Sequence, residues 1–208
     1  MLVQFFRKYF EMAIFPAAIF IFGLGLIAAG YFVSPFEFVG VLLSILGAVL
    51  VKKQIANGHL IAIMAQLLIF THFWRSDAAL GALAFSFIWG SISVISYYNW
   101  TRGRGGKSEL KPSNLPVKVT GGIFAAAAAI VIMHLHTGFV GSIQFLAPLF
   151  GLAGHMSLIN KKAQGWLFLA ICFSVMAVLM WNINSWLLFA RNIVLIMVST
   201  LAFIKWRK

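Results

Sequence analysis

Acidic residues are scarce in this sequence, and cysteine is nearly absent. Among its 208 residues there are four acids, Glu11, Glu37, Asp77 and Glu109, and one cysteine, Cys172. A single cysteine excludes a disulfide within the chain. The four acids stand far apart, near predicted membrane edges or in a polar linker, and so provide no paired carboxylates for acid–base catalysis. We therefore expect that the protein is not an enzyme.

Patterns that hold metals or cofactors are missing as well. No cluster of cysteines or carboxylates has the spacing of metal ligands. His134 and His136 are two residues apart, which places their rings on nearly opposite faces of a helix, so they make a poor metal pair. No glycine-rich loop of the kind that holds phosphates is present. We expect neither a metal nor another cofactor.

Charged residues of either sign are few, and apolar residues dominate. The chain is 62% hydrophobic and 10% charged, and its mean hydropathy is +0.98. A soluble domain of this length cannot bury that much apolar surface, because globular proteins are about half apolar and about a quarter charged. The apolar runs are long and lack strict alternation, which favours helices over a barrel. The composition predicts an all-α polytopic membrane protein.

Long apolar runs separated by short polar segments predict about eight transmembrane helices. The first run is long enough to span a membrane, and we interpret it as an uncleaved helix rather than a signal peptide. A basic polar linker, residues 101–118, divides the chain, which we treat as a single membrane domain over residues 1–208. The predicted helices are residues 9–33, 36–51, 58–74, 78–100, 119–136, 139–159, 165–181 and 185–204.

The basic residues gather in alternate gaps between these helices. Of the 16 lysines and arginines, 14 lie at the two termini, in the linker, or in the gaps after the second and sixth helices. Since basic residues concentrate on the cytoplasmic side, this pattern predicts that the linker and both termini are cytoplasmic. It also explains the net charge of +12 without a nucleic-acid partner.

Similar residues recur in the two halves at nearly constant spacing. In each half a predicted helix ends near a Lys-Lys pair, the next ends at a tryptophan before a polar turn, and a third ends at a tryptophan near basic residues. The pairs are Lys52-Lys53 with Lys161-Lys162, Gly58 with Gly165, Trp74 with Trp181, and Trp100 with Trp206, all 106 to 109 positions apart. The alternative is coincidence, because Trp and Lys are common at membrane interfaces.

If the repeat is real, the chain contains two parallel three-helix units joined by a single linker helix. The units are residues 36–100 and 139–204, and the linker helix is residues 119–136. Three helices per unit reverse the chain direction, so one additional helix between the units restores it. The helix at residues 9–33 is then an extra N-terminal helix outside the repeat. Parallel repeats of this kind recur among transporters.

Several stretches carry a resemblance to known membrane-protein families. They are residues 38–54, His72-Phe73, Ala78-Ala79, residues 147–151, Trp181-Asn182, residues 190–194 and residues 204–207. The helix plan resembles SWEET sugar transporters and PnuC-type vitamin transporters, and the sequence is more similar to YgjV-like bacterial inner-membrane proteins. The resemblance covers roughly residues 38–208. It implies a multi-pass protein of the bacterial inner membrane.

Arg191 is the most informative candidate for a binding residue. A guanidinium in the middle of a membrane helix costs about 2.5–3.5 kcal/mol on insertion scales, so we expect it to face protein or water and to have a partner. One interpretation is a clamp for an anion or carboxylate in a central cavity. The other is a structural pair with a carbonyl or carboxylate of the chain. Asn192 is adjacent but points about 100° away.

A second group of candidates lies on the helix at residues 78–100. Ser86, Trp89 and Ser93 are three and four residues apart, so they share one helix face that combines an aromatic ring with hydroxyls. Such a face suits a sugar or a nucleoside base, and it suits hydrogen bonds between helices equally well. His72 and His155 are interpreted as packing or interfacial histidines.

Two functions follow from these observations. The first is a transporter or facilitator of a small polar solute, which would be a sugar, a nucleoside or vitamin, or a small organic anion, passing between the three-helix units. Its predicted binding residues are Arg191, Asn192, Trp89, Ser86 and Ser93. The alternative is a non-transporting membrane subunit that packs against a partner protein or a second copy. In both cases the lipid bilayer surrounds the protein.

Overall fold

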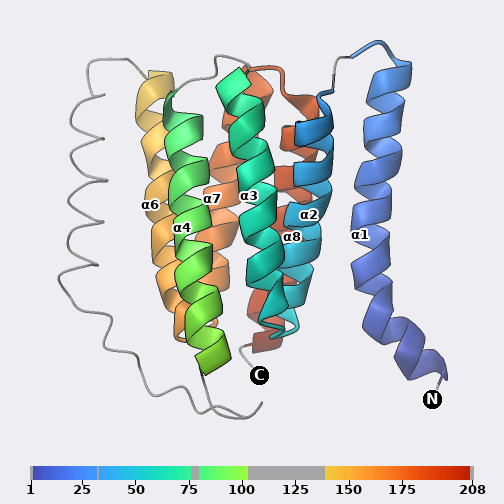
Figure 1. The fold of residues 1–208 in the computed structure, drawn as a ribbon, viewed down its shortest axis with the longest axis vertical. Helices are drawn as coiled ribbons and strands as arrows, with labels where there is room; N and C mark the ends of the chain where they lie inside the picture. The colour runs from blue at the N-terminus through green and yellow to red at the C-terminus, as the bar shows by residue number, and fades with distance from the viewer. Residues whose placement is uncertain (1, 32, 76–79, 103–138, 207–208) are drawn as a thin grey trace.

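The computed structural model describes residues 2–31, 33–75, 80–102 and 139–206 (Figure 1). These residues form seven α-helices and, within the described ranges, no strand. The predicted helix at residues 119–136, most of the basic linker, and His134 and His136 lie outside the described residues. The helices are α1 Leu2–Ala28, α2 Pro35–Lys52, α3 Asn57–Arg75, α4 Leu80–Arg102, α6 Phe139–Ile159, α7 Gln164–Asn182 and α8 Trp186–Trp206.

Six of these helices match their predicted bounds to within two residues at each end. Helix α1 differs, because it begins at Leu2 and ends at Ala28 rather than at residue 33. Gly30 explains the end: its φ is +83°, and Tyr31 N–H donates to the carbonyl of Leu26 at 3.0 Å. A glycine in the left-handed region just beyond a helix is a common C-terminal cap.

Helix α2 begins with a well-formed N-terminal cap. The backbone N–H of Glu37 donates to Ser34 Oγ at 3.1 Å, and Pro35 occupies the first helical turn. Serine accepts a free N–H of the first turn, and proline lacks the N–H that would otherwise be unsatisfied there. The Ser34-Pro35 sequence therefore starts a helix as well as turning the chain.

Six helices form a closed ring, and α1 stands outside it. Each ring helix packs against the next in the order α2, α3, α4, α6, α7, α8, and α8 packs against α2 again. Helix α1 contacts only α2 and α8 among the described helices, and it lies at the edge of the bundle in Figure 1. The ring order places α4 opposite α8, α2 opposite α6, and α3 opposite α7.

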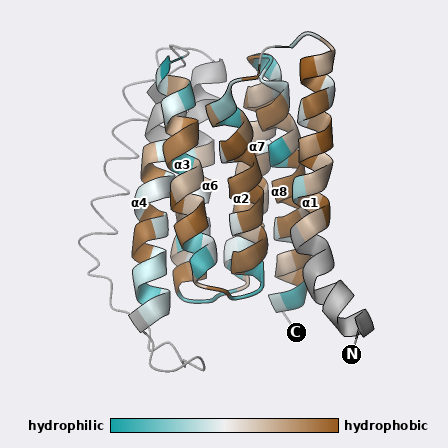
Figure 2. Ribbon diagram, turned by 45° about the vertical axis from the view of Figure 1, so that its right-hand side comes forward, coloured by the Kyte–Doolittle hydropathy of each residue, from teal (hydrophilic) through white to brown (hydrophobic). Residues whose placement is uncertain are grey.

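The surface of the bundle agrees with a membrane location. Apolar residues cover the middle of the helices, and more polar ones gather towards their ends (Figure 2). Among the described helices, α2, α7 and α8 are long and apolar enough to cross a membrane, and residues 13–28 and 147–159 are shorter apolar stretches. The chain is therefore all-helical where it is described, while the count of eight spans stays a prediction.

The turns after α2 and α6 have the same backbone geometry. Gln54 and Lys161 both have positive φ, 60° and 51°. Gln54 N–H donates to Val51 and Lys161 N–H donates to Leu158, at 2.8 and 2.9 Å. These turn residues are 107 positions apart, whereas Lys52 and Lys161 are 109 positions apart. Lys52 ends a helix, whereas Lys161 is itself the left-handed turn residue.

Close glycine contacts follow the same spacing. A Cβ on Gly58 would lie 2.7 Å from the carbonyl oxygen of Gly47, and one on Gly165 would lie 2.6 Å from that of Gly154. Glycine is required at these crossings because no side chain fits between the backbones. In α1, by contrast, a Cβ on Gly25 would meet nothing within 4 Å, so no neighbouring backbone requires glycine at that position.

Candidate functional site

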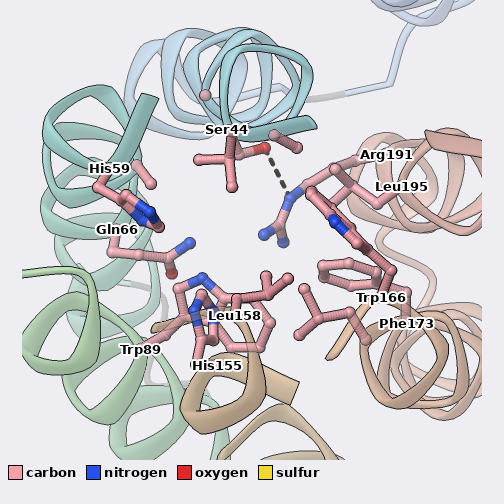
Figure 3. A pocket seen from close by; sticks show the side chains of 15 residues that line it. Ser44, His59, Gln66, Trp89, His155, Leu158, Trp166, Phe173, Arg191 and Leu195 are labelled. Carbon is pink, nitrogen blue, oxygen red and sulfur yellow. Dashed lines mark hydrogen bonds between the residues drawn. The ribbon is translucent and has the colours of Figure 1, made fainter. Parts of the chain in front are cut away.

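A small cavity lies at the centre of the ring, and all six ring helices contribute to its wall (Figure 3). Its volume is about 40 Å³. A water molecule needs roughly 10–15 Å³ of such volume, so the cavity has room for a few waters but not for a nucleoside-sized solute. Its polar and aromatic wall residues are Ser44, His59, Gln66, Trp89, His155, Trp166, Phe173 and Arg191.

Arg191 extends from α8 into this cavity and is bound by a hydroxyl of α2. Its Nε donates to Ser44 Oγ at 2.8 Å, and Ser44 Oγ donates to the carbonyl of Val41 at 2.8 Å. The single hydroxyl proton of Ser44 is thus directed at its own helix, and a lone pair faces the guanidinium. The far side of the guanidinium points into the cavity towards Gln66 (Figure 3).

Several other polar atoms in the wall have no hydrogen-bond partner within the described part of the chain. Buried polar groups are nearly always hydrogen-bonded, so a group of unpaired atoms around one cavity needs a functional or solvent explanation. The residues concerned are 1–5% exposed. The atoms are His59 Nε2, Gln66 Oε1, Trp166 Nε1 and both ring nitrogens of His155.

Trp89 forms the aromatic side of the cavity. Its ring meets His155 edge-on with centroids 4.2 Å apart, and it lies 5.5 Å from the ring of Phe173. Gly151 makes this position possible, because a Cβ there would lie 2.7 Å from Trp89 Cζ3. Trp89 on α4 is therefore seated between α6 and α7.

An aromatic cluster closes one end of the cavity. The ring of Trp206 lies 5.6 Å from Trp166 and 6.3 Å from Trp100, and Trp100 in turn meets His59 edge-on at 4.7 Å. His59 and Trp166 belong to both the cavity wall and this cluster. Trp206 Nε1 also donates to the carbonyl of Lys52 at 2.9 Å, which fixes the cluster to the end of α2.

The same contacts place the two basic turns at one end of the molecule. Lys161 Nζ lies 5.4 Å from the centre of the Trp100 ring, and Trp100 is joined to Lys52 through Trp206. The ribbon agrees, since both described chain ends also lie at that end (Figure 1).

A polar network lies at the opposite end of α2. Ser185 Oγ donates to Glu37 Oε1 at 3.2 Å, and His72 Nε2 lies 3.8 Å from Glu37 Oε2. The other ring nitrogen of His72 is hydrogen-bonded to Ser34 Oγ at 3.0 Å. Three elements, the start of α2, the end of α3 and the start of α8, are thereby joined.

The predicted site residues fall into two groups. Arg191 and Trp89 lie in the cavity wall, on helices that face each other across the ring. Ser86, Ser93 and Asn192 are buried, but they are not among the described residues that line the cavity. Ser93 Oγ donates to the carbonyl of Trp89 on its own helix at 2.9 Å.

Sequence reasoning missed Ser44, His59 and Trp166, and it gave His155 only a packing or interfacial role. Ser44 and Trp166 are ordinary residues in apolar helices, so nothing in their spacing marks them. A signal did exist for His155, because it places a side chain with two polar nitrogens within an apolar run, just as Arg191 places a guanidinium there. What identified Arg191 was its full charge, whose burial costs more than that of a neutral ring.

The fold and the cavity define a class of protein: a polytopic helical membrane protein whose helices surround a buried polar site. Residues 34–208 match the family described as "Nicotinamide mononucleotide transporter". The chain therefore belongs to the nicotinamide mononucleotide transporter family, which confirms the PnuC-type part of the resemblance. No curated protein and no solved structure matches it. The protein is a multi-pass membrane protein of a transporter family, which agrees with the expectation of a non-enzymatic role.

Proposed function

We propose that the protein transports a small polar solute of the nicotinamide mononucleotide type through the centre of the six-helix ring. The observation that carries this proposal is the family match over residues 34–208. The match begins at Ser34, the cap of α2, so it includes every ring helix and leaves out α1.

The hydrogen bonding of the Arg191 guanidinium supports a transporter rather than a closed structural bundle. A purely structural arginine would be engaged by a carbonyl or carboxylate of its own chain. Arg191 instead uses Nε for one serine hydroxyl and directs its other nitrogens into a cavity. We propose that Arg191 and Trp89 contact the solute. Ser86, Ser93 and Asn192 stay predicted binding residues. They are buried but do not line the cavity, so they can contact the solute only after the helices around the cavity rearrange.

The arrangement of the helices supports a two-unit plan. We propose that α2 to α4 and α6 to α8 are parallel three-helix units, joined by a linker helix at residues 119–136. The equal turns at Gln54 and Lys161 and the equal glycine contacts at Gly58 and Gly165 support it. The solute site would then lie between the units.

Transport requires the cavity to enlarge, because about 40 Å³ is too small for a nucleoside. The proposed units meet along two seams, one between α2 and α8 and one between α4 and α6, and the contacts along these seams differ. Three hydrogen bonds join α8 to the α2 side, at Glu37, Ser44 and Lys52. The described contacts between α4 and α6 are aromatic and aliphatic, such as Trp89 with His155. We propose that the units move apart mainly along the α4–α6 seam.

Location and assembly are also proposals. The alternating charge supports cytoplasmic termini, and the resemblance to YgjV-like proteins supports the bacterial inner membrane. A role as a non-transporting subunit, or association with a second copy, would use α1. Helix α1 carries exposed Phe20, Ile21 and Leu24, and with α2 it forms a strongly apolar groove. Lipid tails suit this surface equally well.

Uptake into vesicles tests the proposed function. The purified full chain is reconstituted, and flux of sugars, nucleosides, nicotinamide mononucleotide and small organic anions is compared between native protein and Arg191→Ala. We expect flux of at least one of these solutes in native protein and a loss of at least about tenfold in the variant. Lys162→Ala removes one positive charge from an exposed turn and serves as the control. Native flux equal to that of protein-free vesicles for every solute would refute the transporter.

A further inference from the structure

The charge of Arg191 has no counter-charge in the cavity wall. Apart from Arg191, the wall residues from all six ring helices are glycine, aliphatic, aromatic, histidine, serine or glutamine, and none of those that the structure describes is acidic. Arg191 is 3% exposed, and its one hydrogen bond within the described part of the chain is to the neutral Ser44. A buried charge without an opposite charge is costly, so this arrangement favours a ligand that supplies one.

The acid nearest along α2 does not fill this role. Glu37 is seven residues before Ser44, which corresponds to about 10 Å along a helix. Its carboxylate is already engaged at the end of the bundle, where Ser185 donates to it and His72 lies 3.8 Å away. Because Ser185 and His72 already contact its carboxylate, Glu37 does not act as the partner of Arg191.

The free side of the guanidinium has the geometry of an oxyanion clamp. Ser44 holds Nε, so the side chain is oriented while the Nη donors remain directed into the cavity (Figure 3). The planar fork of arginine donates two parallel hydrogen bonds to a carboxylate or a phosphate. Gln66, whose side chain lies across the cavity, is 3% exposed, and its Oε1 has no partner among the described residues.

We propose that the central cavity selects its solute by charge, and that it takes an anionic group, carboxylate or phosphate, against Arg191 while disfavouring a cation. This inference rests on the proposed transport function and names the chemical class that the site accepts. A solute that carries only a positive pyridinium ring would place two like charges together in a medium of low dielectric constant. A phosphate on the same solute would reverse that interaction.

The test compares solutes that differ only in charge, in vesicles that contain the full chain with the membrane potential held at zero. Nicotinate and nicotinamide share a ring and differ by a carboxylate, so they test the carboxylate. Nicotinamide mononucleotide and its dephosphorylated riboside differ by a phosphate, so they test the phosphate. We expect the anionic member of at least one pair to be preferred by at least about tenfold.

Variants assign the preference to Arg191. Arg191→Gln removes the charge and keeps a polar side chain, and it should abolish the preference. Arg191→Lys keeps the charge without the fork and should retain part of it, which also covers the case in which the glutamine variant does not fold. Arg75→Gln removes one charge from an exposed position at the end of α3 and should leave the preference unchanged.

The outcomes are distinguishable. Transport that ignores charge, or that favours the cation, overturns the inference and leaves the proposed function intact. A preference that persists in both Arg191 variants also overturns it. Failure of every solute to cross above the level of protein-free vesicles overturns the proposed function, and the inference falls with it.

Discussion

At the scale of single residues, Ser44 determines how Arg191 presents its charge. Ser44→Ala removes the acceptor of Nε, and hydrogen bonds to charged groups contribute about 1.5–3 kcal/mol. We expect weaker solute binding, seen as a KM raised by about tenfold or more with a smaller change in maximal rate. Concentration-dependent uptake in vesicles measures both quantities.

Ser91 provides the matched control for that experiment. Its hydroxyl donates to the carbonyl of Phe87 on its own helix at 2.9 Å, and its side chain is exposed. Ser91→Ala should leave uptake unchanged. Equal KM values for native protein and Ser44→Ala would show that the hydroxyl does not position the guanidinium.

Gly151 is a second residue whose role depends on one close contact. An added methyl group would lie 2.7 Å from the Trp89 ring and 3.3 Å from Cys172 Sγ, so Gly151→Ala must displace the tryptophan. Overpacking of this kind costs about 1–3 kcal/mol. We expect reduced solute flux and a lower midpoint of thermal unfolding in detergent. In Gly90→Ala the new methyl group meets Gln66 Cβ at an ordinary 3.6 Å, and normal flux there would show that the effect is specific.

Sequence alone identified the residues whose chemistry is rare in a membrane helix. Arg191 and Trp89 stand out because a charge and a large amphipathic ring are conspicuous among aliphatic residues. Ser86 and Ser93 share a helix face with Trp89, but helical spacing gives only relative direction. Whether a serine reaches a cavity or bonds to its own backbone, as Ser93 does, depends on packing between helices.

At the scale of the elements, glycines in the first turns of α3 and α7 allow these helices to pack closely against α2 and α6. Gly58→Ala would put a methyl group 2.7 Å from the Gly47 carbonyl oxygen, and Gly165→Ala would put one 2.6 Å from that of Gly154. The contacts are with backbone, which cannot rotate away. We expect each variant to lose about 1–3 kcal/mol of stability, measured as a lower unfolding midpoint in detergent.

Gly25→Ala is the control within the same chain, because its new methyl group meets nothing within 4 Å. Alanine also favours helix more than glycine does, so this variant should be as stable as native protein or slightly more so. If Gly58→Ala and Gly25→Ala unfold at the same temperature, the tight crossing of α2 and α3 contributes nothing measurable.

Helix positions were predictable from sequence because apolar runs have to be as long as the membrane is thick. The bounds of α2 and α7 were therefore close to correct. The end of α1 was missed because the apolar run continues to Val33, whereas the left-handed φ of Gly30 ends the helix. The lysine pairs mark only the neighbourhood of the helix ends, because Lys52 lies in α2 whereas Lys161 is a turn residue after α6.

At the scale of the whole molecule, the closed ring could not be read from the sequence. Short turns predict that α2 packs on α3 and that α6 packs on α7. Contacts between α8 and α2, which are far apart in the chain, depend on how the two halves meet. Those contacts create the cavity, because Arg191 and Ser44 come from the two sides of that seam. The site is thus a property of the assembled ring and not of any one helix.

The aromatic cluster at one end of the ring leads to the last prediction. Trp206 joins α8 to the end of α2 through its hydrogen bond to Lys52, and its ring packs edge-on against Trp166. Loss of the hydrogen bond costs about 1 kcal/mol and loss of an aromatic pair about 0.5–1.5 kcal/mol, so Trp206→Ala should open this end about tenfold more often. The sole cysteine, Cys172, is fully buried next to Gly151 and reports such opening.

The measurement is the rate at which a small hydrophilic thiol reagent labels Cys172 in native and variant protein. We expect labelling about tenfold faster in Trp206→Ala, and protection against labelling when a transported solute is bound. Trp181→Ala is the control, because Trp181 is 54% exposed and packs with Trp186 at the start of α8, at the other end of that helix from Trp206. Equal labelling rates in native protein and Trp206→Ala would mean that the contacts of Trp206 do not limit the opening of the bundle.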